Sequence, residues 1–480
     1  MANKTILDFD AVGDPQPDDV LYLKRGTGAS SDRQVSVATL LSGVKSELSS
    51  AVAGVSNIAA TLPKVTAALR SLETNQWGPG SELIGPQAQT GRATAFGCAV
   101  AVDGDHAIVG LYREDVAGVR AGAAYIFSRT GANTWDSGTR VVAPDGAANE
   151  QFGWSVSIDG DYAIVGANLE IINGGSSTGA AYVFRRTGPN SWDDVTKLVA
   201  SDGQAMDGFG WSVDIDGDYA VAGARLSPGN ESRGSAYVFH RTGLNEWDSG
   251  AKLTQPNPIV GDFFGSSVSI SGDYVIAGSW GDDTAALSAG AAWVFRRAGT
   301  NTWDGGTRLL APDAAQSDHF GYSVAIDGEY AIVGAYQEDP SDVANAGSAY
   351  VYRRIDANTW NFVTKLLAPD RIPLDNFGWS VAIDGDYAIV SASNRSGSVP
   401  HGGRAYIFRR TGLDTWDEGT RLTAPYLRSQ DQFGLYVAIS GTYAMVGARG
   451  DVVDTSFPTD TFEVAAYIYG ESFQTTVSQL

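Results

Sequence analysis

The stretch FGWSVSIDGDYAIVGA, residues 152–167, decides the fold, because it recurs along the chain with little change. Close copies are FGYSVAIDGEYAIVGA at 320–335 and FGWSVAIDGDYAIVSA at 377–392. The Phe-Gly pair that opens the stretch occurs seven times, 55 to 57 residues apart, at Phe96, Phe152, Phe209, Phe264, Phe320, Phe377 and Phe433. A fixed period of this length indicates a repeat architecture.

Each unit has the pattern of four β-strands. In the unit at Phe152, the strands SVSI and YAIVGA flank an Asp-Gly pair, which favours a two-residue hairpin because a type I′ turn needs positive φ at both positions. A variable stretch then leads to AAYVFRR, an Arg-Thr-Gly loop and TKLVA. Such units cannot bury their apolar faces alone, but they can when stacked radially. We therefore predict an all-β, seven-bladed β-propeller.

The ends of the propeller must meet for the ring to close. A Trp recurs after the third strand, followed by Asp in most units, at Trp135, Trp192, Trp247, Trp303, Trp360 and Trp416. The last unit lacks this Trp, whereas Trp77 precedes the first Phe-Gly pair. We expect residues 77–85 to supply the fourth strand of the last blade; the alternative is the C-terminal tail, residues 471–480.

The repeated segments resemble the FG-GAP repeats that build integrin α-type propellers, over about residues 77–470. The resemblance implies the same seven-bladed fold. Integrin-type repeats often hold calcium in a D-x-D-x-D-G loop, but the corresponding link here is only Asp-Gly-Asp or Asp-Gly-Glu, as at Asp159 to Asp161. A two-residue turn cannot supply the six to eight oxygens that calcium prefers. We therefore expect no metal site and no cofactor.

The composition argues against several classes of function. The 480 residues include 33 Lys and Arg against 55 Asp and Glu, for a net charge of -22. This balance argues against nucleic acid and against anionic membranes, both of which attract clustered Lys and Arg. The single cysteine, Cys98, excludes a disulfide framework. No apolar run is long enough to insert in a membrane, and the first 26 residues contain no signal-peptide core, so we expect neither insertion nor ordinary secretion.

A different pattern precedes the propeller. Leu41, Leu48, Val55, Leu62 and Leu69 lie seven apart, and Val44, Ala51, Ile58, Val65 and Leu72 follow each by three. This a/d heptad predicts a helical coiled-coil stalk over 41–75, and its mixed seam residues permit a homotrimer. The oligomerisation residues we predict are Leu41, Leu48, Val55, Ile58, Leu62, Val65, Leu69 and Leu72. The alternative is one amphipathic helix packed on the propeller.

Residues 1–40 form a small module in this interpretation. Two short strands around a Gly-containing turn precede the start of the stalk, and the segment resembles the N-terminal attachment segment of bacteriophage tail fibres. The resemblance rests on Asp19, Leu21, Tyr22, Gly26, Val35, Val37 and Leu40, and it implies virion attachment through Asp19, Leu21, Tyr22, Val35 and Val37. The predicted order is therefore an N-terminal β module (1–40), the coiled-coil stalk (41–75) and the propeller (76–480).

Binding residues are expected on the face of the propeller where the loops vary. On this face the links from strand two to strand three differ from blade to blade, and variable loops on a rigid scaffold commonly carry recognition. The position after strand two holds aromatic residues in three blades, each followed by paired acids, an arrangement that suits a sugar. The candidates are Tyr112, Glu114, Asp115, Arg225, Trp280, Asp282, Asp283, Tyr336, Glu338, Asp339 and Arg449. The alternative is that the aromatics only cover the blade tops.

No catalytic motif interrupts the repeat, so we expect a binding protein rather than an enzyme. Together the segments predict a phage tail fibre, located in the virion, whose N-terminus contacts other tail proteins and whose propeller binds a host surface glycan or protein. Two alternatives remain: a structural virion fibre or decoration protein that binds another virion protein, and a bacterial extracellular adhesion propeller.

Overall fold

The computed structural model describes residues 20–21, 35–36, 74–84, 95–115, 120–172, 177–229, 231–393, 403–424, 432–448 and 465–474. The chain divides into two units, Asn75–Phe473 and the remainder. Within the described residues, no helix has the length and apolar character needed to cross a membrane. Their helical element is a 3-10 turn, η3 (Pro340–Asp342).

In the N-terminal unit, β1 (Val20–Leu21) pairs antiparallel with β2 (Val35–Ser36). The predicted attachment residues Asp19, Tyr22 and Val37 lie outside the described residues, as does the predicted stalk from Leu41 to Leu72. Thr74 and Asn75, which the prediction placed at the end of the stalk, belong instead to a strand, β3 (Thr74–Trp77). That boundary was wrong because β3 pairs with β34 (Ala465–Gln474) in the last blade.

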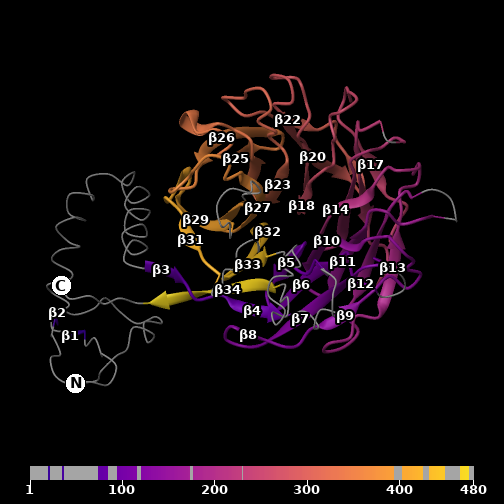
Figure 1. Ribbon diagram of the computed structural model, residues 1–480, viewed down its shortest axis with the longest axis horizontal. Coiled ribbons are helices and arrows are strands. Elements are labelled where there is room, and N and C mark those ends of the chain that lie inside the picture. The colour runs from indigo at the N-terminus through magenta and orange to yellow at the C-terminus, as the bar shows by residue number, and fades with distance from the viewer. Residues whose placement is uncertain are drawn as a thin grey trace, which may run out of the picture. The chain divides into compact units, whose positions relative to one another are not determined.

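Unit Asn75–Phe473 contains seven antiparallel sheets arranged in a ring (Figure 1), which confirms the seven-bladed propeller. We number the blades in the order of their Phe-Gly pairs. Blade 1 contains β5 (Val100–Asp103), β6 (His106–Leu111), β7 (Ala123–Gly131), β8 (Thr134–Trp135) and β9 (Thr139–Val141). Blade 2 contains β10 (Phe152–Asp159), β11 (Tyr162–Ala167), β12 (Ala180–Arg185) and β13 (Asp194–Leu198). Blade 3 contains β14 (Phe209–Asp216), β15 (Tyr219–Ala224), β16 (Ser235–His240) and β17 (Ala251–Leu253).

The remaining blades repeat this order. Blade 4 contains β18 (Val268–Ser271), β19 (Tyr274–Ser279), β20 (Ala291–Gly299), β21 (Thr302–Trp303) and β22 (Thr307–Leu309). Blade 5 contains β23 (Ser323–Asp327), β24 (Tyr330–Ala335), β25 (Ser348–Asp356) and β26 (Thr359–Leu366). Blade 6 contains β27 (Phe377–Asp384), β28 (Tyr387–Ala392), β29 (Arg404–Gly412), β30 (Thr415–Trp416) and β31 (Thr420–Leu422). Blade 7 contains β32 (Phe433–Ser440), β33 (Tyr443–Ala448), β34, β3 and β4 (Ser81–Ile84).

The Phe-Gly pair joins each blade to the one before it. Phe152 is buried against Tyr182 and Phe184 of its own blade, and its backbone forms a parallel bridge with Gly122 of blade 1. A Cβ on Gly122 would lie 2.0 Å from the Phe152 carbonyl oxygen, so only glycine permits this approach. The same bridge recurs from blade to blade, which explains why both the pair and its period persist.

A second set of contacts links the blades at the Asp-Gly hairpins. The first Asp of each hairpin accepts a hydrogen bond from the glycine N–H of the next hairpin, as Asp159 does from Gly217 at 2.8 Å. Serine replaces Asp in blades 4 and 7, and Ser440 closes the circle by accepting from Gly104 at 3.4 Å. The complete ring of acceptors is Asp103, Asp159, Asp216, Ser271, Asp327, Asp384 and Ser440.

Strand β4 closes the propeller, as the position of Trp77 predicted. Leu83 pairs with Ala466, in the same register that Leu309 has with Ala292 in blade 4. Trp77 packs edge-on against Tyr387 of blade 6, with ring centroids 5.7 Å apart, as Trp360 does against Tyr274. The N-terminal segment, rather than the tail, therefore supplies the fourth strand of blade 7.

We predict that Leu83→Ala destabilises the propeller by about 2–4 kcal/mol, because it leaves a cavity in a buried site. The matched variant is Leu309→Ala, which empties the equivalent site in the middle of the chain; both side chains are 3% exposed. Chemical denaturation of the full chain measures both losses. A normal stability for Leu83→Ala beside a destabilised Leu309→Ala would contradict closure through β4.

Candidate functional site

The first strands of the seven blades surround a central channel. Its middle section encloses a cavity of about 310 Å³, lined by residues of all seven first strands. The Asp-Gly hairpins lie at one mouth of this channel, and the Phe-Gly pairs lie at the other. We examine the second mouth because the variable loops emerge there.

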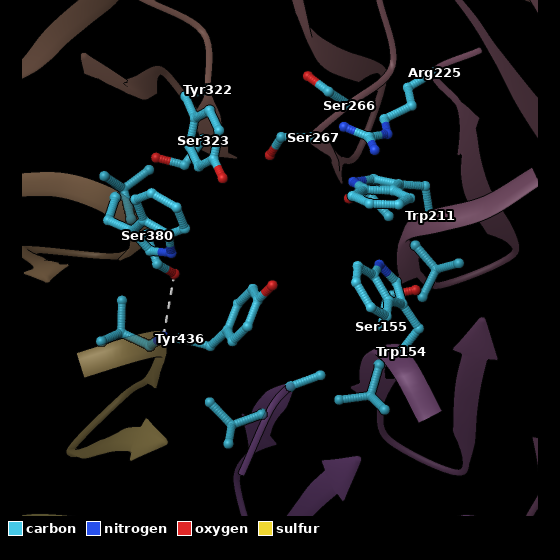
Figure 2. Close-up of a pocket in the computed structure, with 18 of the residues that line it drawn as sticks. Trp154, Ser155, Trp211, Arg225, Ser266, Ser267, Tyr322, Ser323, Ser380 and Tyr436 are labelled. Atoms are coloured by element: carbon cyan, nitrogen blue, oxygen red, sulfur yellow. Dashed lines mark hydrogen bonds between the residues drawn. The ribbon is translucent and has the colours of Figure 1, made fainter. Parts of the chain in front are cut away.

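Each blade contributes one aromatic side chain to this second mouth. We call the set the aromatic cup; its members are Tyr112, Trp154, Trp211, Trp280, Tyr322, Trp379 and Tyr436, from blades 1 to 7 in order. Figure 2 shows Trp154, Trp211, Tyr322 and Tyr436 around an open centre. The cavity drawn there has a volume of about 180 Å³.

Two positions supply six of the seven aromatics, and they compensate for one another. In blade 7 the second residue after Phe is Leu435, and the third, Tyr436, supplies the aromatic side chain. The second residue after Phe is aromatic in blades 2, 3, 5 and 6, but it is Cys98 in blade 1 and Ser266 in blade 4. In those two blades, the position after strand two provides Tyr112 and Trp280 instead. The aromatic lining is therefore maintained although neither position alone is consistently aromatic.

Local backbone geometry turns these side chains toward the channel. The pairing of strands one and two shifts register just after Phe-Gly, between Phe152 and Ser155 in blade 2 and between Phe209 and Val213 in blade 3. A β-bulge re-aims side chains and breaks the simple alternation of a strand. The residue after the glycine therefore points to the channel mouth.

The rings of the cup contact one another around the mouth. Trp154 lies between Tyr112 and Trp211, with ring centroids 4.9 Å and 4.6 Å away. Across the opening, Tyr322 lies 4.7 Å from Trp379. Aromatic pairs at such separations are favourable beyond their area burial, so the cup is a pre-organised surface.

Blades 4 and 5 extend the cup with Phe263, His319 and Tyr336. Phe263 stacks on Trp280 with the ring planes 7° apart and the centroids separated by 4.3 Å. The His319 ring lies 5.0 Å from Trp280, and its Nδ1 lies 3.2 Å from the Tyr336 hydroxyl. Burial lowers the pKa of His319, which favours the neutral imidazole near pH 7. This part of the rim therefore adds aromatic surface without adding charge.

Arg225 is the only charged residue among the described residues that line the cup. Its guanidinium carbon lies 3.3 Å from the centre of the Trp211 ring and 5.9 Å from that of Phe263. The Arg225 Nε is buried and has no hydrogen-bond partner within the described part of the chain. Desolvation lowers the pKa of Arg225, because burial disfavours the charged form.

The predicted acidic residues lie near the aromatic residues in sequence, but their carboxylates make contacts within the protein. The second acid of each pair accepts a backbone N–H across its own loop: Asp115 from Arg120 at 2.7 Å, Asp283 from Ser288 at 2.7 Å, and Asp339 from Asn345 at 2.6 Å.

The first acid of each pair points toward strand four or its own loop. Glu114 pairs with Arg140 at 3.1 Å, Glu338 with Lys365 at 2.7 Å, and Asp282 accepts from the Thr284 N–H at 2.7 Å. The structure thus brings Tyr112, Trp280 and Arg225 together at the mouth, with Tyr336 on the rim, and turns the acids into the loops. Arg449 lies outside the described residues.

Sequence reasoning did not select Trp154, Trp211, Trp379, Tyr322 or Tyr436 for the site. The first three follow Phe-Gly and were interpreted as part of the repeat. A usable signal was present, because this position varies between Trp, Tyr, Ser, Cys and Leu while the residues around it stay nearly constant.

The family model for the FG-GAP repeat matches residues 90–127, 135–184, 192–239, 247–295, 303–352, 360–408 and 416–469. The chain belongs to the FG-GAP repeat family. No curated protein shows a significant match to it. After the first, each matched segment runs from the outer hairpin of one blade to the third strand of the next, so these six matches span the contacts that join neighbouring blades.

In this FG-GAP propeller, the carboxylates of the Asp-Gly-Asp turns form hydrogen bonds and ion pairs with other residues of the protein. Asp159 bonds the next blade's Gly217, and Asp161 pairs with Arg186. Among the described residues, no group of three His, Cys, Asp or Glu side chains is placed to hold a metal ion. Both carboxylates of the turn therefore stabilise the scaffold.

One further carboxylate, Asp214, lies inside the channel. Blades 2 and 4 carry Ser157 and Ser269 at this position, and the other four blades carry alanine. Asp214 accepts hydrogen bonds from the Ser157 hydroxyl at 2.7 Å and the Ile270 N–H at 2.8 Å. Burial nevertheless raises the pKa of Asp214 from 3.8 to about 6.

We predict that Lys365→Met destabilises the protein by about 1–3 kcal/mol, because it leaves the Glu338 carboxylate buried without its cation. Arg308→Met is the matched control. Arg308 occupies the same register position in blade 4, but its guanidinium donates to the Thr284 hydroxyl at 2.8 Å. We expect a loss below about 1 kcal/mol there. If both variants lose the same free energy of unfolding, measured by thermal or chemical denaturation, the ion pair between Lys365 and Glu338 does not stabilise the protein.

We predict that Asp214→Ser removes a pH-dependent part of the stability. Because the folded-state pKa lies above the unfolded value, the folded protein binds more protons between about pH 4 and 6, and the contribution of Asp214 declines as pH rises through this range. The free energy of unfolding of the native protein, minus that of the variant, should increase by about 1–3 kcal/mol from about pH 7 to pH 4. A difference that does not change with pH would show that Asp214 titrates normally.

Proposed function

We propose that this protein is a bacteriophage tail fibre whose propeller binds a glycan receptor on the host cell surface. The observation that carries the proposal is the aromatic cup, in which seven blades each direct one aromatic side chain to a single mouth of the channel. The repeat itself does not require an aromatic residue after Phe-Gly, because Cys98, Ser266 and Leu435 occupy this position in three blades. Seven converging aromatics therefore favour recognition.

The chemistry of the cup suits a saccharide. Aromatic faces pack against the C–H surface of a sugar ring, and the lining hydroxyl groups of Ser266, Tyr322 and Tyr436 offer hydrogen bonds to sugar hydroxyls. Binding sites of this kind combine apolar and aromatic walls with a few polar groups that set orientation. The cup has both components.

Binding, rather than hydrolysis, is the activity we propose. Glycoside hydrolysis normally requires two carboxyl groups on either side of the scissile bond. The acids closest in sequence to the cup, such as Asp283 and Asp339, instead hold backbone N–H groups of their own loops. This use of the carboxylates is consistent with a site that recognises a ligand and leaves it unchanged.

The N-terminal sequence supplies the rest of the proposal. The heptad over 41–75 would assemble a trimer, and residues 1–40 would attach it to other tail proteins of the virion. An oligomer presents several cups at once, so modest affinity at each site becomes firm attachment through avidity. The alternatives are a structural virion fibre or decoration protein and a bacterial extracellular adhesin.

We predict that Trp211→Ser and Trp280→Asn each weaken binding of the full-length protein to host cells and their purified surface glycans by at least about tenfold, since each removes an anchor of the cup. Both replacements exist at the equivalent position of another blade, as Ser266 and Asn168, so the fold should accept them. Binding is measured by biolayer interferometry and by blocking of phage adsorption.

Phe362→Ser is the control, because it removes an exposed aromatic from the outer strand β26 and should leave binding unchanged. Folded cup variants that bind host cells normally would contradict receptor binding at the cup. Binding of the native protein to another virion protein through the propeller, with none to cells or glycans, would favour the structural alternative.

A further inference from the structure

We infer that the cup selects a saccharide that carries a negatively charged group, and that Arg225 binds this group. The inference rests on the proposed function, because it specifies the ligand of the same site. A sugar carboxylate and a sugar phosphodiester share the required chemistry: each presents paired oxygens to the planar, forked donors of a guanidinium.

The first argument is the contrast between Arg225 and the arginines at the opposite mouth. Arg241 stacks on Tyr162 and also pairs with Asp218. Arg297 and Arg410 do the same, each with a tyrosine of the preceding blade and an aspartate of its own blade. Among the described residues, no carboxylate pairs with Arg225, which keeps the aromatic contact, so its guanidinium can pair with an anionic ligand.

The second argument concerns Asp207, an acidic residue beside the Arg225 segment, and the groups that its carboxylate binds. Asp207 accepts the Leu226 N–H at its backbone carbonyl, which places it beside the Arg225 segment. Both carboxylate oxygens of Asp207 bond backbone N–H groups, one of Gly229 at 2.6 Å and the other of Gln204 at 2.8 Å. Both oxygens of this neighbouring carboxylate are therefore occupied by backbone N–H groups.

The third argument concerns the free-energy cost of burying the Arg225 guanidinium. A partly buried guanidinium whose Nε lacks a partner lowers stability unless something compensates it. Stacking on Trp211 compensates in part, and it also holds the guanidinium still beside the open centre of the cup (Figure 2). A pre-positioned cation loses little freedom when an anion binds, which is the condition for selective recognition.

The surroundings of Arg225 complete a subsite. Ser266 and Ser267 of the next blade line the same cavity, and Figure 2 shows both near the guanidinium. Tyr322 and Tyr436 present their phenol groups to the same space. A sugar ring packed on the aromatic wall can thus place its anionic group at Arg225 and its hydroxyls at these side chains.

The test compares acidic and neutral members of matched oligosaccharide pairs. The probes are galacturonate and galactose oligomers, sialylated and desialylated lactosamine, and one oligosaccharide with and without a glycerol group attached through a phosphodiester. Full-length native protein, Arg225→Gln and Arg225→Lys are titrated with each probe while tryptophan fluorescence is followed. Circular dichroism and thermal unfolding establish that the variants are folded. Arg296→Gln is the control, because it removes an exposed positive charge on β20.

We expect the native protein to prefer the acidic member of at least one pair, and the preferred class to show whether the group is a carboxylate or a phosphodiester. Arg225→Gln should weaken that interaction about 10- to 100-fold and leave the neutral partner unaffected. Arg225→Lys should retain part of the preference, and added salt should weaken the native interaction.

Two other results have distinct meanings. Equal binding of acidic and neutral members, unchanged in Arg225→Gln, would overturn the role of Arg225 and leave glycan binding intact. Binding to no oligosaccharide and to no host glycan would overturn the proposed function, and the inference with it.

Discussion

The close approach of neighbouring blades at the Phe-Gly pair is the contact on which the rest of the propeller depends. A Cβ on Gly278 of blade 4 would lie 1.9 Å from the carbonyl oxygen of Gly321 in blade 5, and the same contact joins Gly447 to Gly97 at the closure, at 2.2 Å. Backbones this close exclude side chains, so these positions cannot carry recognition. Variation is confined to the flanking residues, which are the ones that build the cup.

Repetition explains how much of the fold the sequence predicted. The period of the repeat, the Asp-Gly hairpins and the position of Trp77 each reflect a contact that recurs from blade to blade. Seven copies of the same pattern support the same prediction of the fold. Closure through β4 followed because Trp77 and Leu83 occupy positions that other blades define. The boundary at Thr74 was missed because only one copy of that junction exists and no repeat marks it.

The candidate site was predicted only in part, for a physical reason. The position after strand two was compared across blades, which selected Tyr112, Trp280 and Arg225. The residue after Phe-Gly was assigned to the scaffold, because Trp recurs there in three blades and was interpreted as part of the repeat. The register shift after Phe152 turns this residue toward the same mouth, and no residue pattern in one blade predicts that shift. The acids were predicted beside the aromatics because sequence neighbours were expected to face together, whereas backbone N–H groups within the loops attract the carboxylates.

A sevenfold scaffold here supports a site that has no sevenfold symmetry. Among the described residues, Arg225 of blade 3 is the one charged side chain that lines the cup. In blade 4 the residue before Phe-Gly is Phe263, with a φ of 53°, where blade 3 has Gly208. A bulky residue in the left-handed region costs free energy, and such strain persists where the surroundings compensate for it. Phe263 also packs parallel to Trp280, a contact that adds to the stability of this conformation. The cation and the stacked pair lie next to one another on the rim, with the Arg225 guanidinium carbon 5.9 Å from the Phe263 ring centre. The repeat provides a rigid frame, and within the described residues Arg225 and the stacked pair of Phe263 and Trp280 make the mouth asymmetric.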